Sequence, residues 1–379
     1  MAAQHILILN SEYPPIGGGA GNASAQVARH LAQLGRQVTV LTARFADLPH
    51  DEEQDGVRVV RLPALRAQQD RSGSLEQISF LLSAAILGLP WLLRLRPQAV
   101  LAFFGAPSGL AAWFWSLFVA VPYIVSLRGG DVPGFRPYDF ARQHRLLAPW
   151  LRRVWRRAHA VVANSQGLHD LGARFEPQVP IAIIPNGVDA ERFQVADRQW
   201  APARLLFVGR VVYQKGIDLL LAALAGLTTP EWHLTIVGDG PRRAELAAQA
   251  EQLGIAPRVN FAGWKSGAEL AAAYAQANLF AYASRHEGMP NALLEAMASG
   301  LPAVATRIAG NEELVVPGET GLLVPAEDVA TLRGALATLM ADPAQRQRYG
   351  AAARKRAQTR YSWQAVAQQY AALLDQATE

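Results

Sequence analysis

The sequence of 379 residues contains no cysteine, and only three of its 36 basic residues are lysines. Without cysteine there is no disulfide framework, no cysteine-ligated zinc or iron–sulfur centre and no thiol catalysis. Charged residues make up only 18% of the chain and hydrophobic residues 51%, which excludes a disordered tail and allows large cores. At about 150 residues per domain, this length predicts two domains.

The positive charge is uneven along the chain. Through Pro185 there are 18 basic and 12 acidic residues, a net charge of +6, whereas from Asn186 onward there are 18 and 19, a net charge of −1. The first half therefore suits an anionic surface or substrate better than the second half does. An arginine-rich coding bias would produce the same asymmetry, and both explanations stay open.

Two uncharged stretches are long enough to raise the question of a membrane span. Residues 97–127 carry no charge, but the GAPSG segment at 105–109 and Pro122 divide the stretch into a strand, a helix over Leu110–Ala120 and a second strand over Tyr123–Leu127. A buried β-turn-α-β unit explains this pattern better than a transmembrane helix does. In the second stretch, 77–93, apolar residues recur at helical spacing. We expect a core helix there, with an amphipathic helix lying on a membrane surface as the alternative.

The first ten residues lack the basic segment and the long apolar stretch of a secretory signal. They are typical of a buried strand over His5–Leu9 that runs into a glycine-rich turn. We therefore expect a cytoplasmic protein, with peripheral association at the inner face of an anionic membrane as an alternative.

Strand-like and helix-like runs alternate along the chain, which is the pattern of parallel sheets wrapped by helices. The alternation stops after Pro185 and starts again at Arg204. We therefore predict two doubly wound domains of the α/β class, one formed by residues 1–184 with a last helix at 362–379 and one by residues 185–361. In such sheets ligands bind beyond the carboxyl ends of the strands, so functional residues should lie in strand-to-helix loops.

The first such loop is the GGGAG segment at 17–21. Glycines there let the backbone approach a ligand, and the helix that we expect over Ala23–Leu34 would present its N-terminal N–H groups to a phosphate. The dinucleotide fingerprint is only loosely matched, and no acidic residue follows the second strand, so nicotinamide binding is disfavoured. The alternative is an ordinary tight turn.

The second loop holds Arg210 after Gly209 and Lys215 before Gly216. An arginine and a lysine five residues apart on one loop can converge on a pyrophosphate, the arginine as a bidentate fork and the lysine as a point charge. A solvated basic loop is the alternative.

The third site is the pair Glu287 and Glu295, which lie on either side of the start of a predicted helix over Asn291–Ser299. One carboxylate accepting hydrogen bonds from the hydroxyls of a sugar, and another doing so for a ribose, would serve a nucleotide sugar. Ordinary acidic residues at a helix start are the alternative.

A fourth loop, RGGD at 128–131, follows a strand of the first half. Arg128 and Asp131 could meet a reacting centre from this glycine-hinged loop. The alternative is a structural arginine–aspartate pair.

Together these four loops and the GDGP turn at 238–241 closely resemble the family-4 retaining glycosyltransferases of the GT-B type, and the resemblance covers essentially the whole chain. It implies two Rossmann-like domains facing across a cleft, with the last helix crossing back to the first domain. It also implies that the second domain holds a nucleotide-sugar donor and that the first domain holds the acceptor.

The resemblance also assigns residues. Arg210 and Lys215 match the pair that binds the donor diphosphate, Glu287 the carboxylate on the donor sugar, and Glu295 the ribose-binding carboxylate. Further donor contacts follow from the same match: Gly18, Gly19, Gly263, Trp264, Lys265, Gly288, Met289, Pro290 and Asn291. Arg128 stands where many members carry the histidine of a His-Gly-x-Asp stretch, which leaves open whether Arg128 or only Asp131 has the catalytic role.

The chemistry that these assignments suggest is stabilisation of the leaving group by two cations. Retention would proceed by attack on the same face, with the departing phosphate taking the proton of the acceptor. No Asp-x-Asp pair is present, so we expect no metal and no cofactor, and the nucleotide-diphosphate sugar is a substrate.

We expect a hexose to be transferred to a sugar, a lipid-linked acceptor or another hydroxyl acceptor in cell-envelope polysaccharide or glycolipid synthesis, with no nucleic-acid partner. Three alternatives are a GT-B-like sugar phosphorylase, a nucleotide-sugar epimerase and a non-catalytic nucleotide-sugar-binding scaffold.

Overall fold

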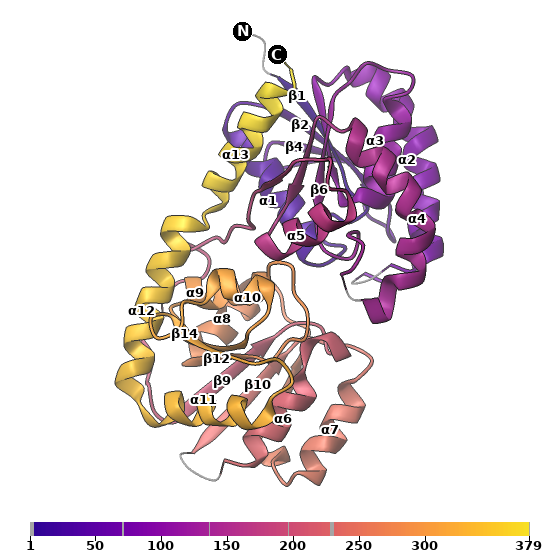
Figure 1. Cartoon of the computed structure of the whole chain (residues 1–379). Coiled ribbons are helices and arrows are strands. Elements are labelled where there is room, and N and C mark those ends of the chain that lie inside the picture. The colour runs from indigo at the N-terminus through magenta and orange to yellow at the C-terminus, as the bar shows by residue number, and fades with distance from the viewer. Residues whose placement is uncertain (1–3, 70–71, 136, 196, 228–230, 379) are drawn as a thin grey trace. The chain divides into compact units, whose positions relative to one another are not determined.

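The chain folds into two compact units, seen in a computed structural model that describes residues 4–69, 72–135, 137–195, 197–227 and 231–378 (Figure 1). Unit 1 comprises Met1–Asn186 together with Trp363–Glu379, and unit 2 comprises Gly187–Ser362. Each unit has a mainly or wholly parallel sheet covered by helices. The doubly wound architecture predicted for both halves is therefore confirmed.

The sheet of unit 1 has eight strands among the described residues, and seven of them run parallel. The exception is the first strand in the spatial order, which pairs antiparallel with the second as a hairpin. The order is β3 (Asp51–Gln54), β4 (Val57–Leu62), β2 (Gln37–Ala43), β1 (His5–Leu9), β5 (Ala99–Phe103), β6 (Tyr123–Leu127), β7 (Ala160–Ala163) and β8 (Ile181–Ile183).

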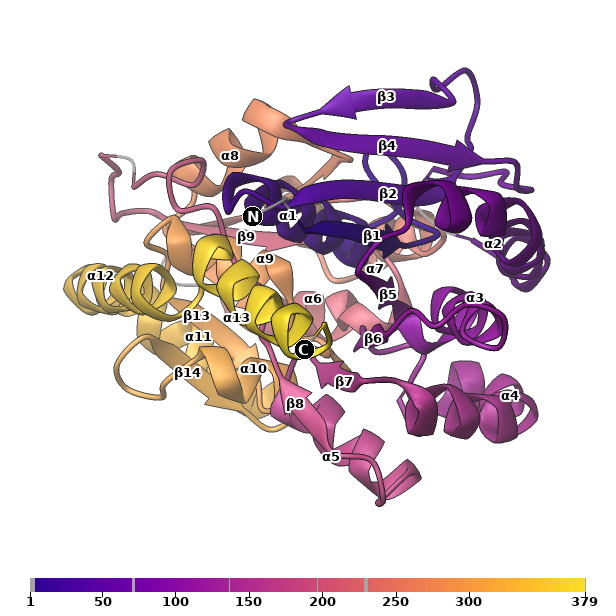
Figure 2. The ribbon, with the colours of Figure 1, turned by 90° about the horizontal axis from the view of Figure 1, so that it is seen from above.

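Both faces of this sheet are buried. Along β1, Ile6 and Ile8 point into one hydrophobic core and Leu7 and Leu9 into another, as the two-residue period of a strand requires. Figure 2 shows the helices on the two sides of the sheet. The side of Leu7 is covered by α2 (Ser74–Leu95), α3 (Leu110–Trp115), α4 (Pro137–Arg157) and α5 (Gln166–Phe175), and the side of Ile6 by α1 (Gly19–Gln33) and α13 (Trp363–Gln376).

The last helix, α13, belongs to unit 1. Its residues Trp363, Val366 and Tyr370 are buried in the same core as Ile6. The Tyr370 hydroxyl is 2.7 Å from the Ser126 hydroxyl at the end of β6. The predicted return of the C-terminal helix to the first domain is thus confirmed.

The uncharged stretch 97–127 forms β5, a π-helical turn at Phe104–Gly109, α3 and β6, as predicted. Helix α3 is shorter than expected: it ends at Trp115 rather than near Ala120. In the other apolar stretch, α2 buries only one side. Gly88 on that side lets the Trp115 ring approach so closely that a Cβ at position 88 would lie 2.6 Å from it.

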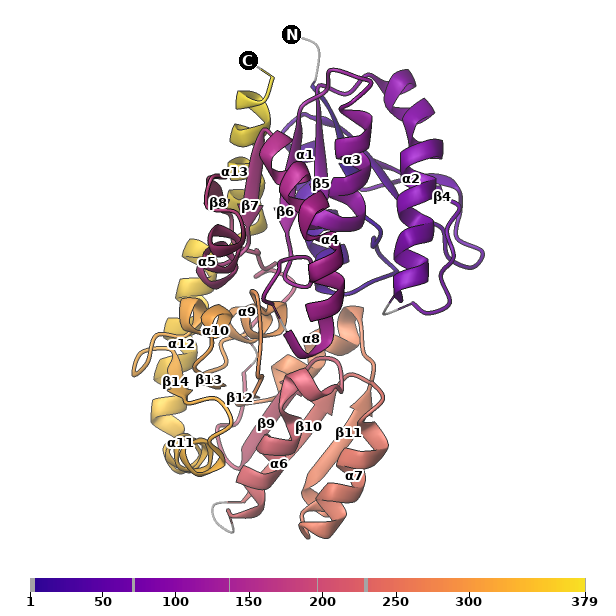
Figure 3. The ribbon, with the colours of Figure 1, turned by 45° about the vertical axis from the view of Figure 1, so that its right-hand side comes forward.

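Unit 2 has a six-stranded sheet among its described residues, and all of its strand pairs are parallel. Figure 3 shows two of its helices, α6 and α7, beside three of its strands, β9, β10 and β11. The strand order is β11 (Val259–Gly263), β10 (Trp232–Val237), β9 (Ala203–Val208), β12 (Leu279–Tyr282), β13 (Ala303–Thr306) and β14 (Gly321–Val324). The helices are α6 (Ile217–Ala225), α7 (Arg243–Gln252), α8 (Gly267–Gln276), α9 (Asn291–Ala298), α10 (Ala309–Leu314), α11 (Val329–Ala341) and α12 (Pro343–Arg360).

Two helical glycines of unit 2 provide a matched test of close packing. A Cβ at Gly350 on α12 would lie 2.2 Å from the Gly300 carbonyl oxygen, whereas a Cβ at Gly334 on α11 would meet no atom within 4 Å. Gly334→Ala should raise the free energy of unfolding by about 1 kcal/mol through helix propensity. Gly350→Ala should lower it by about 1–3 kcal/mol, because the overlap with a backbone oxygen outweighs that gain. Denaturant unfolding of the two variants measures both, and a rise in both would contradict the packing.

Candidate functional site

The candidate site of unit 2 lies at the ends of β9 and β12. These two strands are parallel neighbours in the sheet, so the loops that follow them lie next to each other. Gly216, which follows the β9 loop, has a φ of +61°, and a Cβ there would lie 1.9 Å from the Ala283 carbonyl oxygen. Only glycine combines this conformation with this approach. The loop after β9 is therefore pressed directly against the end of β12.

The same two loops are held together by Gln214. Its side-chain amide donates a 2.6 Å hydrogen bond to the backbone carbonyl of His286. Its backbone carbonyl accepts a 2.7 Å hydrogen bond from the backbone N–H of Arg285. Gln214 is buried and was not among the residues predicted from the sequence. It fixes the distance between the lysine of one loop and the glutamate of the other.

Lys215 and Glu287 form an ion pair that is largely shielded from solvent. The Lys215 Nζ lies 2.5 Å from the Glu287 Oε1, and their side chains are 11% and 8% exposed. The Tyr282 hydroxyl completes the cluster, 2.9 Å from the Lys215 Nζ and 2.8 Å from the same Glu287 oxygen, to which it donates. A buried charge of either sign is costly unless it is paired in this way.

Arg210 acts on the same cluster. Burial and the neighbouring Glu287 carboxylate hold the pKa of the Tyr282 hydroxyl well above its usual value, whereas the charge of Arg210 works in the opposite direction. Arg210 itself is exposed. The structure therefore brings together Lys215 and Glu287, two of the residues predicted from the sequence, around a tyrosine that was not predicted. Of Arg210, it shows that its charge acts on this tyrosine.

Glu295 lies on α9 and is bonded to a second unpredicted tyrosine. The Tyr274 hydroxyl donates to the Glu295 Oε2 at 2.8 Å and is also within 3.1 Å of the Ala292 carbonyl. Burial raises the pKa of Glu295 from 4.5 to about 7, although the Tyr274 hydrogen bond and the charge of Arg192 favour the ionised form. Further hydroxyl groups that donate hydrogen bonds to a carboxylate desolvated in this way would stabilise its ionised form.

The segment between the two glutamates leads into α9. Pro290 is the N-cap of α9 and Asn291 is its first helical residue. Met289 is buried. A Cβ at Gly310 would lie 2.1 Å from the Gly288 carbonyl oxygen, so α10 packs closely on this segment.

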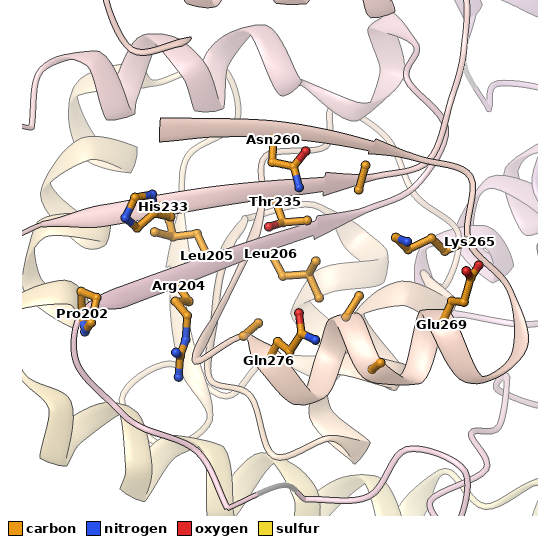
Figure 4. A pocket seen from close by; sticks show the side chains of 14 residues that line it. Pro202, Arg204, Leu205, Leu206, His233, Thr235, Asn260, Lys265, Glu269 and Gln276 are labelled. Atoms are coloured by element: carbon orange, nitrogen blue, oxygen red, sulfur yellow. The ribbon is translucent and has the colours of Figure 1, made fainter. Parts of the chain in front are cut away.

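The predicted base-binding turn lies at the end of β11. Gly263 has a φ of +71° and accepts a hydrogen bond from the Gly238 N–H, and Trp264 is exposed. Lys265 and Glu269 lie at one end of a groove that extends over β9, β10, β11 and α8 (Figure 4). The ion-paired cluster and Glu295 do not line this groove, whereas Lys265 of the predicted base-binding turn does.

The glycine-rich loop of unit 1 begins the first helix earlier than expected. Helix α1 starts at Gly19, with Gly18 as its N-cap, rather than near Ala23. The Glu12 carboxylate accepts a 3.3 Å hydrogen bond from the Gly18 N–H, and a Cβ at Gly17 would lie 2.5 Å from the Glu12 Cβ. An anionic side chain is thus already present where the sequence suggested a phosphate.

Arg128 and Asp131, also in unit 1, make different kinds of contact: Arg128 contacts other side chains, whereas Asp131 contacts backbone N–H groups. The Arg128 guanidinium donates to the Asn186 side chain at 2.7 Å and to the Tyr370 hydroxyl at 3.2 Å, and it lies 4.4 Å from the centre of the Phe103 ring. The buried Asp131 carboxylate accepts hydrogen bonds from backbone N–H groups, including that of Arg128 at 2.9 Å. Burial raises the pKa of Asp131, and these N–H groups oppose the rise. A contact of either residue with a sugar stays a prediction.

Metal ligands are not gathered at these loops. Within the part of the chain that the structure describes, no group of three or more His, Asp or Glu residues is placed to hold a metal ion. The metal independence expected from the sequence is untested by this observation.

The fold and the site define a GT-B glycosyltransferase, an enzyme of two Rossmann-like units that moves a sugar from a nucleotide sugar. Residues 190–356 match the family Glycosyl transferases group 1, and residues 18–187 match a Glycosyl transferase 4-like domain. The chain belongs to this family, that of the family-4 retaining glycosyltransferases, as the sequence motifs suggested.

The sequence similarity to known proteins extends over almost the whole chain. A glycogen synthase of Mycobacterium tuberculosis is 31% identical, over 96% of this chain and 92% of that protein. A GDP-mannose-dependent alpha-(1-6)-phosphatidylinositol monomannoside mannosyltransferase of Mycolicibacterium smegmatis is 28% identical, over 97% and 98%. The structure of a sucrose-phosphate synthase from Thermosynechococcus elongatus superposes with a TM-score of 0.88 at 24% identity, covering 98% of both chains, which shows the shared fold.

Glu295 should make stability depend on pH. Its pKa is about 7 in the folded protein against 4.5 for an ordinary glutamate, so the folded state binds this proton more tightly. Its contribution to the free energy of unfolding is present at low pH and is lost as the pH rises from about 4.5 to about 7, by up to roughly 1.4 kcal/mol per pH unit. We therefore expect the free energy of unfolding of wild type, measured with urea at each pH, to fall relative to that of Glu295→Gln as the pH rises across this range. Parallel curves would contradict the raised pKa.

Proposed function

We propose that unit 2 binds the nucleotide-diphosphate sugar through Arg210, Lys215, Glu287 and Glu295. The observation that carries the proposal is the buried Lys215–Glu287 pair at the strand ends. The cation is suited to a diphosphate and the carboxylate to the hydroxyls of a sugar, so one donor would satisfy both. Glu295, which is hydrogen-bonded to Tyr274, would accept hydrogen bonds from the ribose hydroxyls, and the turn at 263–265 would contact the base.

The proposed chemistry places Arg210 and Lys215 at the departing phosphate. The bond between the anomeric carbon and the phosphate oxygen breaks, its electron pair goes to the phosphate, and a bond forms from the acceptor oxygen to the same face of the sugar. The acceptor proton passes to the departing phosphate oxygen. Two cations placed before the reaction stabilise the charge that develops there, and no protein nucleophile is required.

The proposed acceptor partner of unit 1 is a hydroxyl of a sugar or of a lipid-linked glycan, in cell-envelope polysaccharide or glycolipid synthesis. The net positive charge of the first 185 residues supports an anionic or membrane-borne acceptor. The relative named for a phosphatidylinositol mannoside supports the same class. We place the reaction in the cytoplasm, at the inner face of a membrane. Gly18 and Gly19 would close over the donor phosphates, and Arg128 or Asp131 would contact the transferred sugar.

Turnover of Lys215 and Glu287 variants tests the donor site. Lys215→Ala and Glu287→Ala should each lower kcat by roughly a hundredfold or more, because each removes a group that contacts the reacting sugar or its leaving group. Lys355→Ala is the matched control, since Lys355 is exposed on α12 of the same unit. Activity of both site variants near that of the control would refute the proposal. Mass analysis of the products with and without acceptor separates transfer from epimerisation and phosphorolysis.

A thermal-shift screen over UDP-, GDP- and ADP-sugars identifies the base. A donor that binds only the folded state raises the unfolding midpoint, by an amount that grows with its concentration relative to its Kd. We expect one base to give the largest shift, and we expect Glu295→Gln to weaken that shift as the pH is raised to 8, where wild-type Glu295 is ionised. Equal shifts in wild type and Glu295→Gln at pH 8 would remove Glu295 from the site.

A further inference from the structure

Helix α2 of unit 1 exposes one whole side that is apolar. It is the one helix among the described residues that is long and apolar enough to cross a membrane, yet only 28% of its most apolar 18-residue window is buried. The buried residues include Phe80, Ala84, Gly88 and Leu92, four residues apart. The opposite side carries five residues that are 51–76% exposed: Leu75, Ile78, Leu82, Ile86 and Leu93.

The exposed apolar surface continues onto the neighbouring elements. Helix α3 packs against both α2 and α4 (Figures 2 and 3), and the turn that follows it exposes Leu117 and Phe118. On α4, Leu146 and Trp150 are exposed as well. The Trp150 ring meets the Trp113 ring edge-to-face with centroids 5.9 Å apart, so α3 and α4 form one layer. We call the outer side of this layer the α2–α4 face.

Helix α4, which forms one side of this face, is strongly basic. Helix α4 contains six arginines and one acidic residue, a charge of +5, which is most of the +6 carried by residues 1–185. Arg142, Arg145 and Arg153 are exposed on it, and the Arg153 guanidinium lies 5.1 Å from the centre of the Trp150 ring. An apolar stripe thus lies beside a strongly basic helix that carries an exposed tryptophan.

We propose that the α2–α4 face docks on the surface of a bilayer that contains anionic phospholipids. The side chains of the α2 stripe would enter the boundary between headgroups and acyl chains, the arginines of α4 would contact lipid phosphates, and Trp150 would lie at headgroup level. The inference deepens the proposed function, because it requires that the acceptor be membrane-borne, but the docking itself needs no donor.

Charge complementarity favours a bilayer over a second copy of the chain. Two α2–α4 faces brought together would oppose two helices of charge +5, which costs free energy, whereas anionic lipid neutralises them. Spanning is disfavoured, since α2 packs through Phe80 and Leu92 on the core of unit 1 and its far side alone is available. The helix therefore lies on the membrane in this proposal.

Vesicle flotation of the full chain tests the docking. Wild type should float with vesicles of phosphatidylglycerol and phosphatidylcholine at low salt, and much less with phosphatidylcholine alone or at high salt. The triple variant Arg142→Gln, Arg145→Gln and Arg153→Gln should bind roughly a hundredfold more weakly. These three are chosen because Arg152 and Arg156 pair with Glu176, and Arg157 donates to Ser116.

Two further variants complete the experiment. The triple variant Ile78→Ser, Leu82→Ser and Ile86→Ser should lose roughly tenfold or more in binding to anionic vesicles, through the apolar contribution. The matched control removes three exposed basic residues from α12 of unit 2 and should float like wild type: Arg348→Gln, Lys355→Gln and Arg360→Gln. Every variant is first checked for an unchanged unfolding midpoint.

Three results would overturn the docking proposal. They are failure of wild type to float with anionic vesicles, equal loss in the α12 control, and concentration-dependent dimers that the serine variant abolishes without any flotation, which would make a second copy the occupant. Lys215→Ala should float like wild type. If Lys215→Ala floats and also keeps wild-type turnover, the donor-site proposal alone is refuted. If the wild type turns over its substrates but does not float, the docking alone is refuted.

Discussion

The carbonyl oxygen of Ala283 lies where a side chain at position 216 would begin, and the candidate site depends on this contact. Because Gly216 has no Cβ, the loop after β9 lies directly on the end of β12. Lys215 is then held between the Tyr282 hydroxyl and the Glu287 carboxylate. Similar contacts recur nearby, since a Cβ at Gly238 would lie 2.0 Å from the Gly209 carbonyl oxygen. The strand ends of unit 2 are packed backbone against backbone, which leaves the side chains of the loops to form the site.

The ion pair at the centre of this site is stable only as a pair. Removing either Lys215 or Glu287 from water alone would cost several kcal/mol, and the mutual attraction together with the Tyr282 hydrogen bonds offsets most of it. Under the proposed function, a donor exchanges partners: its diphosphate replaces the carboxylate beside Lys215, and its sugar hydroxyls replace the ammonium beside Glu287. Such an exchange needs little reorganisation, since both groups are already desolvated and fixed.

Short, strongly patterned signals predicted most of the fold. Strand β1 has the bounds expected from its apolar run, and Lys215 and Glu287 meet as the strand-end rule requires. The β3–β4 hairpin was missed because β3 reads DEEQ, which lacks any apolar alternation. Tyr274 and Tyr282 were missed because a buried tyrosine resembles core in sequence. Only the three-dimensional contacts show to which carboxylate its hydroxyl donates a hydrogen bond. The same is true of α2, because only the contacts show which side of this helix is covered.

The hairpin at the margin of the first sheet has a consequence for how the protein behaves in concentrated solution. Strand β3 offers Asp51, Glu52 and Glu53, and a strand of another molecule approaching this edge would meet a row of carboxylates, two of which pair with Arg58 and Arg61. Natural sheets discourage edge-to-edge association in this way. Concentrating the protein should therefore not join molecules through this edge of the sheet.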